Sequence, residues 1–305
     1  MSDSKLHPKP SSRCGFVALL GRPNVGKSTL MNHMLGQKLS ITCRKPQTTR
    51  HRIVGIHTEG TTQMVFLDTP GIHSDQPKAI NRMMNRAAER SALEADVLVF
   101  IVDGLVYNDQ DAAVCRQLSR LKLPVLLVIN KIDNLSDKTA LLAHINFLSQ
   151  QAEFAEIIPV SALRNQNLDR LEACIEKYLP LSEHIYEGDQ LTDRSMRFLA
   201  AELIREKVMR QLGQELPYQI AVEIEEFAVD EGVFHISAVL LVERSGQKPI
   251  VIGNKGERLK KIGQEARQDM EALFDGKVML NLWVKVKGGW SDDIRALRSL
   301  GYDEP

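Results

Sequence analysis

Six short apolar runs, each bounded by turn-forming residues, constrain the fold of the first part of the chain more than any other feature. They lie at 16–20, 52–56, 64–68, 96–103, 124–130 and 156–162. Unbroken β-branched runs of this length are typical of strands that are buried on both faces of a parallel sheet. The stretches between them, such as 140–151 and 168–179, have helical periodicity and fit crossover connections. The pattern predicts a doubly wound, mostly parallel α/β sheet.

The pattern changes after Pro180. Residues 181–193 lack apolar periodicity, and a helical stretch then runs over 194–213. Two alternating strand-like segments, a helix and a third strand are predicted at 218–227, 234–243, 257–274 and 278–287. The order α-β-β-α-β indicates a smaller α+β domain. We expect a flexible tail over 1–13, a first domain over 14–181, a linker over 182–192 and a second domain over 193–305.

Composition excludes several classes of protein. The chain has 39 Lys and Arg against 39 Asp and Glu, so bulk attraction to nucleic acid or to a lipid surface is not expected. The four cysteines are widely spaced and form no metal-binding pattern, which favours free thiols in the cytoplasm. The apolar runs are too short to span a membrane, and the first residues carry no apolar signal segment.

Residues 21–28 read GRPNVGKS and follow the first predicted strand directly. This is the spacing of a phosphate-binding loop, in which backbone N–H groups and a helix N-terminus face phosphate oxygens. We expect Lys27 to reach the β- and γ-phosphates and the Ser28 hydroxyl to ligate Mg²⁺. The predicted phosphate contacts are Gly21, Arg22, Pro23, Asn24, Val25, Gly26, Lys27, Ser28 and Thr29.

Three further elements follow later strands, and the carboxyl ends of parallel strands meet in one crevice. At the first of them, Asp68 is expected to hold Mg²⁺ through water, and the Gly71 N–H to meet the γ-phosphate. We therefore predict a catalytic set of Lys27, Thr49, Asp68 and Gly71, with further nucleotide contacts from Thr69, Pro70 and Ile72.

The other two elements, at 130–133 and 161–162, select the base. The Asp133 carboxylate can accept from the N1–H and the exocyclic amine of guanine, whereas adenine offers no matching donors and would leave the charge unpaired. Lys131 can lie along the purine face, and the backbone of Ser161 and Ala162 can meet the guanine carbonyl. The predicted base contacts are Asn130, Lys131, Ile132, Asp133, Ser161 and Ala162.

Residues 41–52 read ITCRKPQTTRHR, a basic and polar loop. We expect a mobile segment that becomes ordered when the γ-phosphate is present. Thr49 is the preferred second hydroxyl on Mg²⁺, with Thr48 as the alternative.

Two other residues bear on hydrolysis. Ile72 stands where Ras-like GTPases have a water-orienting Gln, so intrinsic hydrolysis should be slow. Asn24 is a candidate ligand for K⁺, and the alternative is that its side chain only stabilises the loop.

Residues 253–256 read GNKG, between two predicted strands and a helix. A G-x-x-G turn at this place lets backbone approach the sugar-phosphate of single-stranded RNA, as in K-homology domains. The predicted RNA contacts are Gly253, Asn254, Lys255, Gly256, Arg258, Lys260 and Lys261. The alternative is a solvated basic face. Trp290, after two glycines, is a candidate for an exposed position.

Taken with these motifs, the whole chain resembles the Era family of bacterial GTPases, in which a GTPase domain precedes a type II K-homology domain. The resemblance rests on 21–60, on the DTPGIH and NKID elements, and on the segment around the GNKG turn. It implies a monomeric factor that binds GTP and GDP. It also implies binding of the 3′ end of 16S rRNA during assembly of the 30S subunit, and peripheral contact with the inner membrane. The alternative is an RNA-binding adaptor in which the nucleotide is structural.

Overall fold

The computed structural model describes residues 12–43, 45, 48–71, 79–135, 138–213 and 216–300. It divides into two compact units. The first comprises residues up to 37 together with 53–69 and 89–193. The second comprises 38–52, 70–88 and 194–305. Two segments from the first part of the sequence therefore belong, by their contacts, to the second unit. Across the described residues, no helix has the length and apolar character needed to cross a membrane.

The first unit is built on a six-stranded sheet in the order β2-β3-β1-β4-β5-β6. All pairs are parallel except β2 with β3, which form an antiparallel hairpin. The strands are β1 (Arg13–Leu20), β2 (Ile53–Glu59), β3 (Thr62–Asp68), β4 (Val97–Asp103), β5 (Val125–Asn130) and β6 (Glu156–Pro159). The predicted doubly wound, mostly parallel sheet is confirmed.

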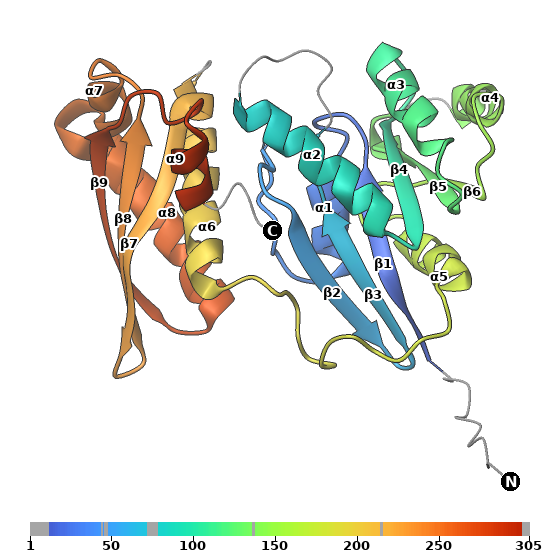
Figure 1. Cartoon of the computed structure of the whole chain (residues 1–305), viewed down its shortest axis with the longest axis horizontal. Helices are drawn as coiled ribbons and strands as arrows, with labels where there is room; N and C mark the ends of the chain where they lie inside the picture. Colours follow the sequence, from blue (N-terminus) through green and yellow to red (C-terminus); the bar gives the residue numbers. More distant parts are fainter. Residues whose placement is uncertain are drawn as a thin grey trace, which may run out of the picture. The chain divides into compact units, whose positions relative to one another are not determined.

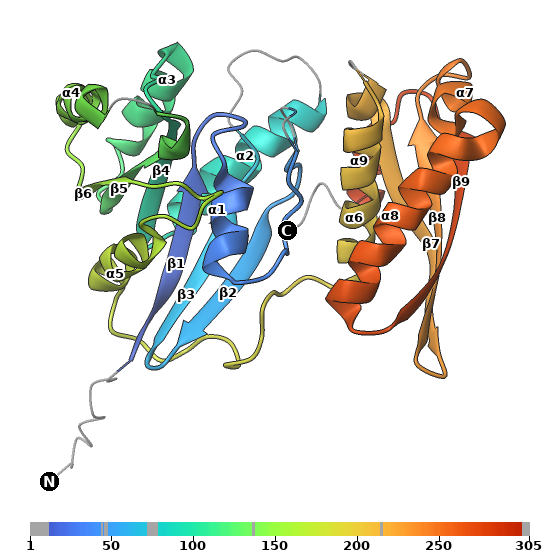
Figure 2. The same ribbon diagram turned by 180° about the vertical axis from the view of Figure 1, so that it is seen from behind.

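Helices cover both faces of this sheet. They are α1 (Lys27–Met34), α3 (Asp109–Leu118), α4 (Lys138–Ser149) and α5 (Leu168–Tyr178). Helix α2 (Ala79–Glu94) begins in the second unit and ends in the first. Helices α1 and α5 lie on one face and α3 on the other (Figures 1 and 2). Strands β1, β3, β4 and β5 are almost wholly buried, which is why their sequences are unbroken apolar runs.

The second unit contains a three-stranded sheet in the order β7-β8-β9. Strands β7 (Ile220–Asp230) and β8 (Val233–Val242) form a hairpin, and β9 (Lys277–Val286) runs parallel to β8. Helices α6 (Met196–Gln211) and α8 (Glu257–Phe274) pack on one face (Figure 2). The predicted α-β-β-α-β order is present, with two short helices added, α7 (Gln247–Ile252) and α9 (Ile294–Ser299).

The second unit has an apolar core around Trp290, which is only 1% exposed. Its ring packs with Ala221, Val239 and Leu241 of the sheet and with Leu297 of α9. The expectation of an exposed Trp290 is therefore wrong. The glycines before it suggested an open loop, but they lead the chain back over the sheet face, and α9 then covers that face.

Candidate functional site

The phosphate loop at 21–28 joins β1 to α1 and uses backbone conformations that favour glycine. Gly21 and Gly26 have φ of 148° and 103°, and Asn24 adopts the left-handed region with φ of 64°. A Cβ atom on Gly26 would lie 2.3 Å from the Asn130 side-chain nitrogen. The loop can therefore be built only with a glycine next to Lys27.

Two side chains that the sequence assigns to phosphate and metal lie at the start of α1. The Lys27 ammonium donates to the carbonyl oxygens of Gly21 and Arg22, at 3.0 and 3.1 Å. Burial lowers the pKa of Lys27 to about 8, against the opposing effect of the Asp68 carboxylate. Among the described residues, the hydrogen-bond acceptors of this buried cation are neutral carbonyls, so it is prepared to bind an anion.

The Ser28 hydroxyl donates to Oδ2 of Asp68 at 2.7 Å. The carboxylate is fully buried at the end of β3. A hydroxyl and a carboxylate oxygen brought together in this way are hard oxygen donors of the kind that Mg²⁺ prefers. The residues present therefore fit the predicted metal.

Asn130, at the end of β5, connects three loops. Its side-chain nitrogen donates to the Val25 carbonyl at 2.8 Å, and its oxygen accepts from the backbone N–H groups of Lys131 and Ala162 at 2.8 and 2.9 Å. The Lys131 ammonium donates in turn to the Asn24 carbonyl and to Asp103, both at 2.7 Å. The predicted phosphate and base elements thus form one hydrogen-bonded framework. The sequence assigned Asn130 to the nucleotide and did not indicate this connecting role.

The carboxylate of Asp133, which is predicted to select the base, is oriented by a hydrogen bond to one of its oxygens. Oδ1 of Asp133 accepts from the Ser161 hydroxyl at 2.5 Å, and that hydroxyl oxygen accepts from the Arg164 N–H. Asp133 itself is exposed. An oriented and accessible carboxylate can pair with the adjacent N–H groups of guanine.

Three other predicted residues are Thr69, Ile72 and Thr49. The Thr69 hydroxyl donates to the Leu19 carbonyl at 2.8 Å, so it joins the end of β3 to β1. Ile72 lies outside the described residues. Thr49 is 6% exposed and belongs to the segment that packs with the second unit. Its role as a metal ligand stays a prediction.

The predicted RNA-binding turn follows α7. Gly253 and Gly256 have φ of 77° and 83°, and Lys255 is also left-handed, with φ of 48°. Asn254 and Lys255 are exposed at its tip. The Arg258 guanidinium donates to the Ile250 carbonyl and so closes the turn, and its contact with RNA stays a prediction. Lys260 and Lys261 stay exposed on the first turns of α8.

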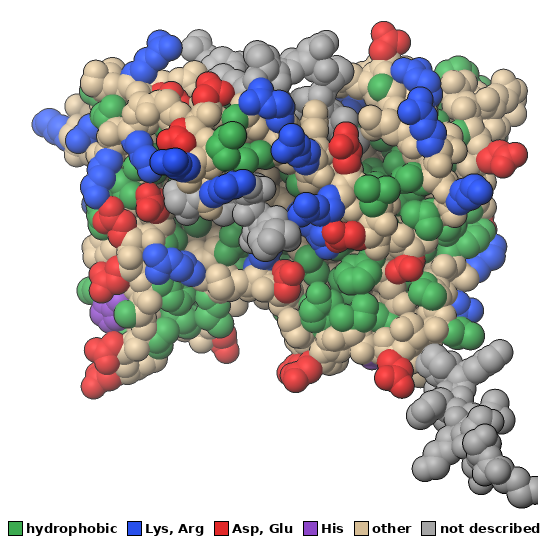
Figure 3. Space-filling model, in the orientation of Figure 1, with side chains coloured by type: hydrophobic (Ala, Val, Ile, Leu, Met, Phe, Trp, Pro, Cys, Tyr) green, Lys and Arg blue, Asp and Glu red, His purple; other side chains and the backbone are tan. Residues whose placement is uncertain are grey.

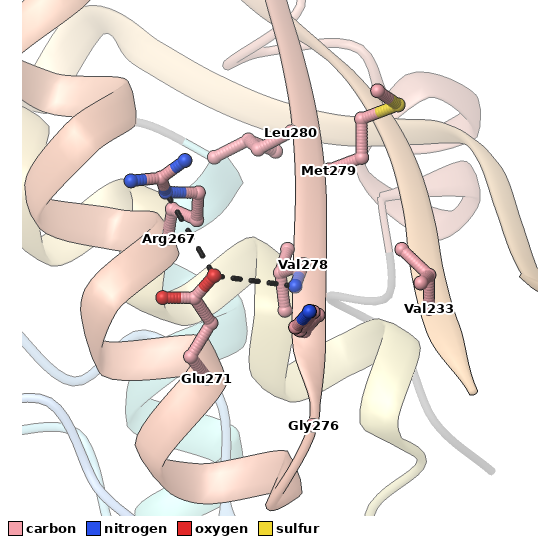
Figure 4. Close-up of a pocket in the computed structure, with 8 residues that line it drawn as sticks. Val233, Arg267, Glu271, Gly276, Val278, Met279 and Leu280 are labelled. Carbon is pink, nitrogen blue, oxygen red and sulfur yellow. Dashed lines mark hydrogen bonds and ion pairs between the residues drawn. The ribbon is translucent and has the colours of Figure 1, made fainter.

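A groove continues from this turn between α8 and β9. Its first hollow, of about 490 Å³, is lined by Gly256, Lys260, Gln264 and Leu282, among others. A second hollow of about 740 Å³ lies farther along, where Glu271 accepts from the Val278 N–H at 3.3 Å and faces Arg267 (Figure 4). The sequence did not indicate Gln264, Arg267 or the β9 side chains. They are not adjacent in sequence to the G-x-x-G motif, and only the packing of α8 on β9 brings them to it.

Basic and acidic side chains gather at different ends of the second unit. On the face in Figure 3, Lys and Arg atoms gather toward the α7 end, and Asp and Glu atoms toward the β7–β8 turn. The sequence of 244–261 contains six basic residues and one acidic residue. The groove therefore begins at a locally basic end, although the chain as a whole carries no net charge.

Comparison with known proteins supports both sites. Residues 16–131 match the family described as 50S ribosome-binding GTPase, and residues 215–291 match the KH domain family. The protein named GTPase Era from Ectopseudomonas mendocina is 63% identical over 293 residues, which cover 96% of this chain and 98% of the relative. The chain belongs to the Era family of GTPases.

Other Era proteins are similar over the full length. GTPase Era of Marinobacter nauticus is 58% identical, and that of Pseudomonas aeruginosa strain LESB58 is 60% identical, each over the whole of both chains. A crystal structure of an Aquifex aeolicus Era variant bound to GDP·AlF4⁻ is 40% identical, with a TM-score of 0.93.

A second crystal structure, of Era in complex with MgGDPNP and nucleotides 1506–1542 of 16S ribosomal RNA, has the same identity and TM-score. Each alignment spans 96% of this chain and the whole of the Era structure. The family resemblance and the predicted combination of a GTPase domain with a K-homology domain are thus confirmed.

Proposed function

We propose that this protein is a GTP-hydrolysing switch that binds the 3′ region of 16S rRNA and acts in assembly of the 30S subunit. The observation that carries the proposal is that one chain holds both a phosphate loop with an oriented base-selecting carboxylate and a G-x-x-G turn above a groove. The Era complex with MgGDPNP and 16S rRNA supports both ligands.

For the nucleotide, the proposed phosphate contacts are the backbone of the phosphate loop and the Lys27 ammonium. Ser28 and, through water, Asp68 are the proposed Mg²⁺ ligands, with Thr49 joining when the γ-phosphate is present. The metal, when bound, neutralises charge that develops on the transferred phosphoryl group. The Asp133 carboxylate holds guanine. K⁺ at Asn24 is a further proposal, tested by comparing hydrolysis in K⁺ and Na⁺ for the wild type and for Asn24→Ala.

For the RNA, the proposed contacts are the turn 253–256 together with Lys260 and Lys261. The exposed tip at Asn254 and Lys255 can approach phosphates, and the hollow behind it can take bases. We keep 14–181 as the nucleotide-binding domain, 182–192 as a linker and 193–305 as the RNA-binding domain. We further propose a cytoplasmic monomer with peripheral inner-membrane contact, to be checked by sedimentation and vesicle flotation.

Two measurements test the function. Single-turnover phosphate release from GTP should occur in the wild type and be lost in Lys27→Ala. Labelled RNA with the sequence of the 16S 3′ end should bind with different affinity in the presence of a GTP analogue and of GDP. The double variant Asn254→Asp, Lys255→Asp should lose RNA binding and keep hydrolysis. Absence of turnover with intact RNA binding would instead support the structural-nucleotide adaptor.

A further inference from the structure

Helix α6 of the second unit buries four charged side chains. Glu202, Arg205, Glu206 and Lys207 are each at most 4% exposed. A charge taken out of water requires an opposite charge or hydrogen bonds of good geometry. Glu202 and Arg205 satisfy one another on α6, with an Nε to Oε1 distance of 2.7 Å. Glu206, which is fully buried, depends on partners from elsewhere in the chain.

Two residues of segment 38–52 are partners of Glu206. Its Oε2 accepts from the Lys38 ammonium at 2.6 Å, and its Oε1 accepts from the Thr42 backbone N–H at 2.9 Å. On α6 itself, Arg210 donates to Oε1 at 2.9 Å and Lys207 donates to Oε2 at 3.3 Å. One buried carboxylate therefore holds both a side chain and the backbone of the segment that carries Thr49.

The same segment has further anchors on this unit. The Lys45 ammonium donates to the carbonyls of Met209 and Leu212, where α6 ends and carbonyls lack helical partners. Arg205 donates to the Thr48 carbonyl. The described part of this segment is thus bonded to α6 at several points before Thr49.

The contact extends to the helix that bears the RNA-binding residues. Lys38 also donates to Asp269 of α8 at 2.6 Å, so one ammonium joins the segment to α6 and α8 together. Burial alone would raise the pKa of Asp269, but hydrogen bonds from Lys207 and Lys38 lower it below its usual range. Asp269 lies about two helical turns beyond Lys261 on α8. A displacement of the segment would therefore change a contact of α8, the helix that begins at the G-x-x-G turn.

We propose that Glu206 is a positioning residue that couples nucleotide state to RNA affinity, by holding segment 38–52 on α6 and, through Lys38, on α8. The inference rests on the proposed function, in which Thr49 moves to the metal with the γ-phosphate. Such a movement changes how the segment bonds to Glu206, and the change reaches α8. Coupling between two sites is reciprocal, so RNA should alter nucleotide affinity by the same factor.

The experiment measures the ratio of the RNA dissociation constants with GDP and with a GTP analogue, for the full chain and labelled 16S 3′-end RNA. We expect a ratio of about fivefold or more in the wild type, the lower end of typical coupling. It should fall below about twofold in Glu206→Gln, which keeps the shape of the side chain and removes its charge. Affinity for GDP should stay within about twofold, because no described contact of Glu206 involves the phosphate loop.

Lys38→Met provides a second variant that leaves α6 intact, and Lys38 is partly exposed, so folding should tolerate it. It should lower the ratio as Glu206→Gln does, and it decides the matter if Glu206→Gln does not fold. Glu225→Gln, which removes the acid of an exposed pair with Lys285 in the same unit, is the matched control and should keep the ratio.

The inference would be overturned if Lys38→Met and folded Glu206→Gln both kept the wild-type ratio and only unfolded at a lower temperature. Glu206 would then have a purely structural role. A wild-type ratio of one would instead overturn the proposed switch itself.

Discussion

The phosphate loop and segment 38–52 both belong, by sequence, to one nucleotide site, but different parts of the chain hold them. The loop is held within the first unit, by Asn130 and Lys131 at the end of β5. The segment is bonded to α6 and to the residues before β7. The phosphate loop therefore depends on contacts within the first unit. The segment that is expected to respond to the γ-phosphate is instead bonded to the unit that carries the predicted RNA-binding turn.

The largest expected effect is a loss of nucleotide affinity when the charged side chain of the phosphate loop is removed. Lys27→Ala should weaken GTP and GDP binding about a hundredfold, because hydrogen bonds to charged groups contribute about 1.5–3 kcal/mol each. Titration with fluorescent nucleotides measures it. RNA affinity of the nucleotide-free protein should not change, and a parallel loss of RNA binding would show that the two regions are not separately held.

A substitution at the base site should change specificity more than total affinity. Asp133→Asn should weaken GDP binding about thirtyfold, since it loses a charged acceptor for the guanine N–H groups. It should improve binding of xanthosine diphosphate, whose carbonyl at C2 can accept from the new amide. Competition titration with the two nucleotides gives both values. Asp169→Asn, in the first turn of α5, is the control and should match the wild type.

A substitution of Arg50 tests how firmly segment 38–52 is bonded to the second unit. Its buried guanidinium donates to the carbonyls of Pro217, Tyr218 and Ile220. Arg50→Ala should lower the free energy of unfolding of the second unit by about 1–2 kcal/mol. Both tryptophans of the chain, Trp283 and Trp290, lie in that unit, so their fluorescence in urea reports on it. Unchanged urea midpoints would mean that segment 38–52 contributes nothing to this unit.

The smallest expected effect is on pH dependence. The pKa of Lys27 is lowered by burial to about 8, and a bound phosphate should raise it, so binding takes up a proton above pH 8. The contribution of Lys27 to affinity is therefore complete below pH 8 and declines as pH rises. Between pH 7 and 9, GDP affinity should fall by up to about tenfold. Lys27→Ala should bind GDP weakly and without this dependence; the same slope in that variant would assign it to another group.

Sequence predicted those features that depend on neighbouring residues. The phosphate loop, the strand-end motifs and the GNKG turn each lie within a few residues. The glycines of the phosphate loop and of the GNKG turn have the positive φ that such turns need. The strands of both units and their succession along the chain also follow from the apolar runs. The short helices α7 and α9 span six residues each, too few for a helical period to stand out.

Features that depend on distant partners could not be predicted. The basic residues of 41–52 suggested an open polar loop, but Arg50 is 2% exposed, because its partners lie about 170 positions away. The partners of Glu206 in segment 38–52 are likewise more than 160 positions away in the sequence. The apolar start of α2 gave no sign that Ile80 and Met84 pack in one cluster with Trp290.

The discontinuous composition of the second unit has a consequence for how the chain folds. Residues 38–52 and 70–88 are synthesised long before 194–305, yet they complete the same compact unit. Domains generally form from the N-terminus onward during synthesis, so these segments must wait until α6 has emerged. A fragment that begins at residue 193 would lack the Lys38, Lys45 and Arg50 anchors and would leave the Glu206 charge without its segment partners. We therefore expect such a fragment to be less stable than the same residues are in the intact chain.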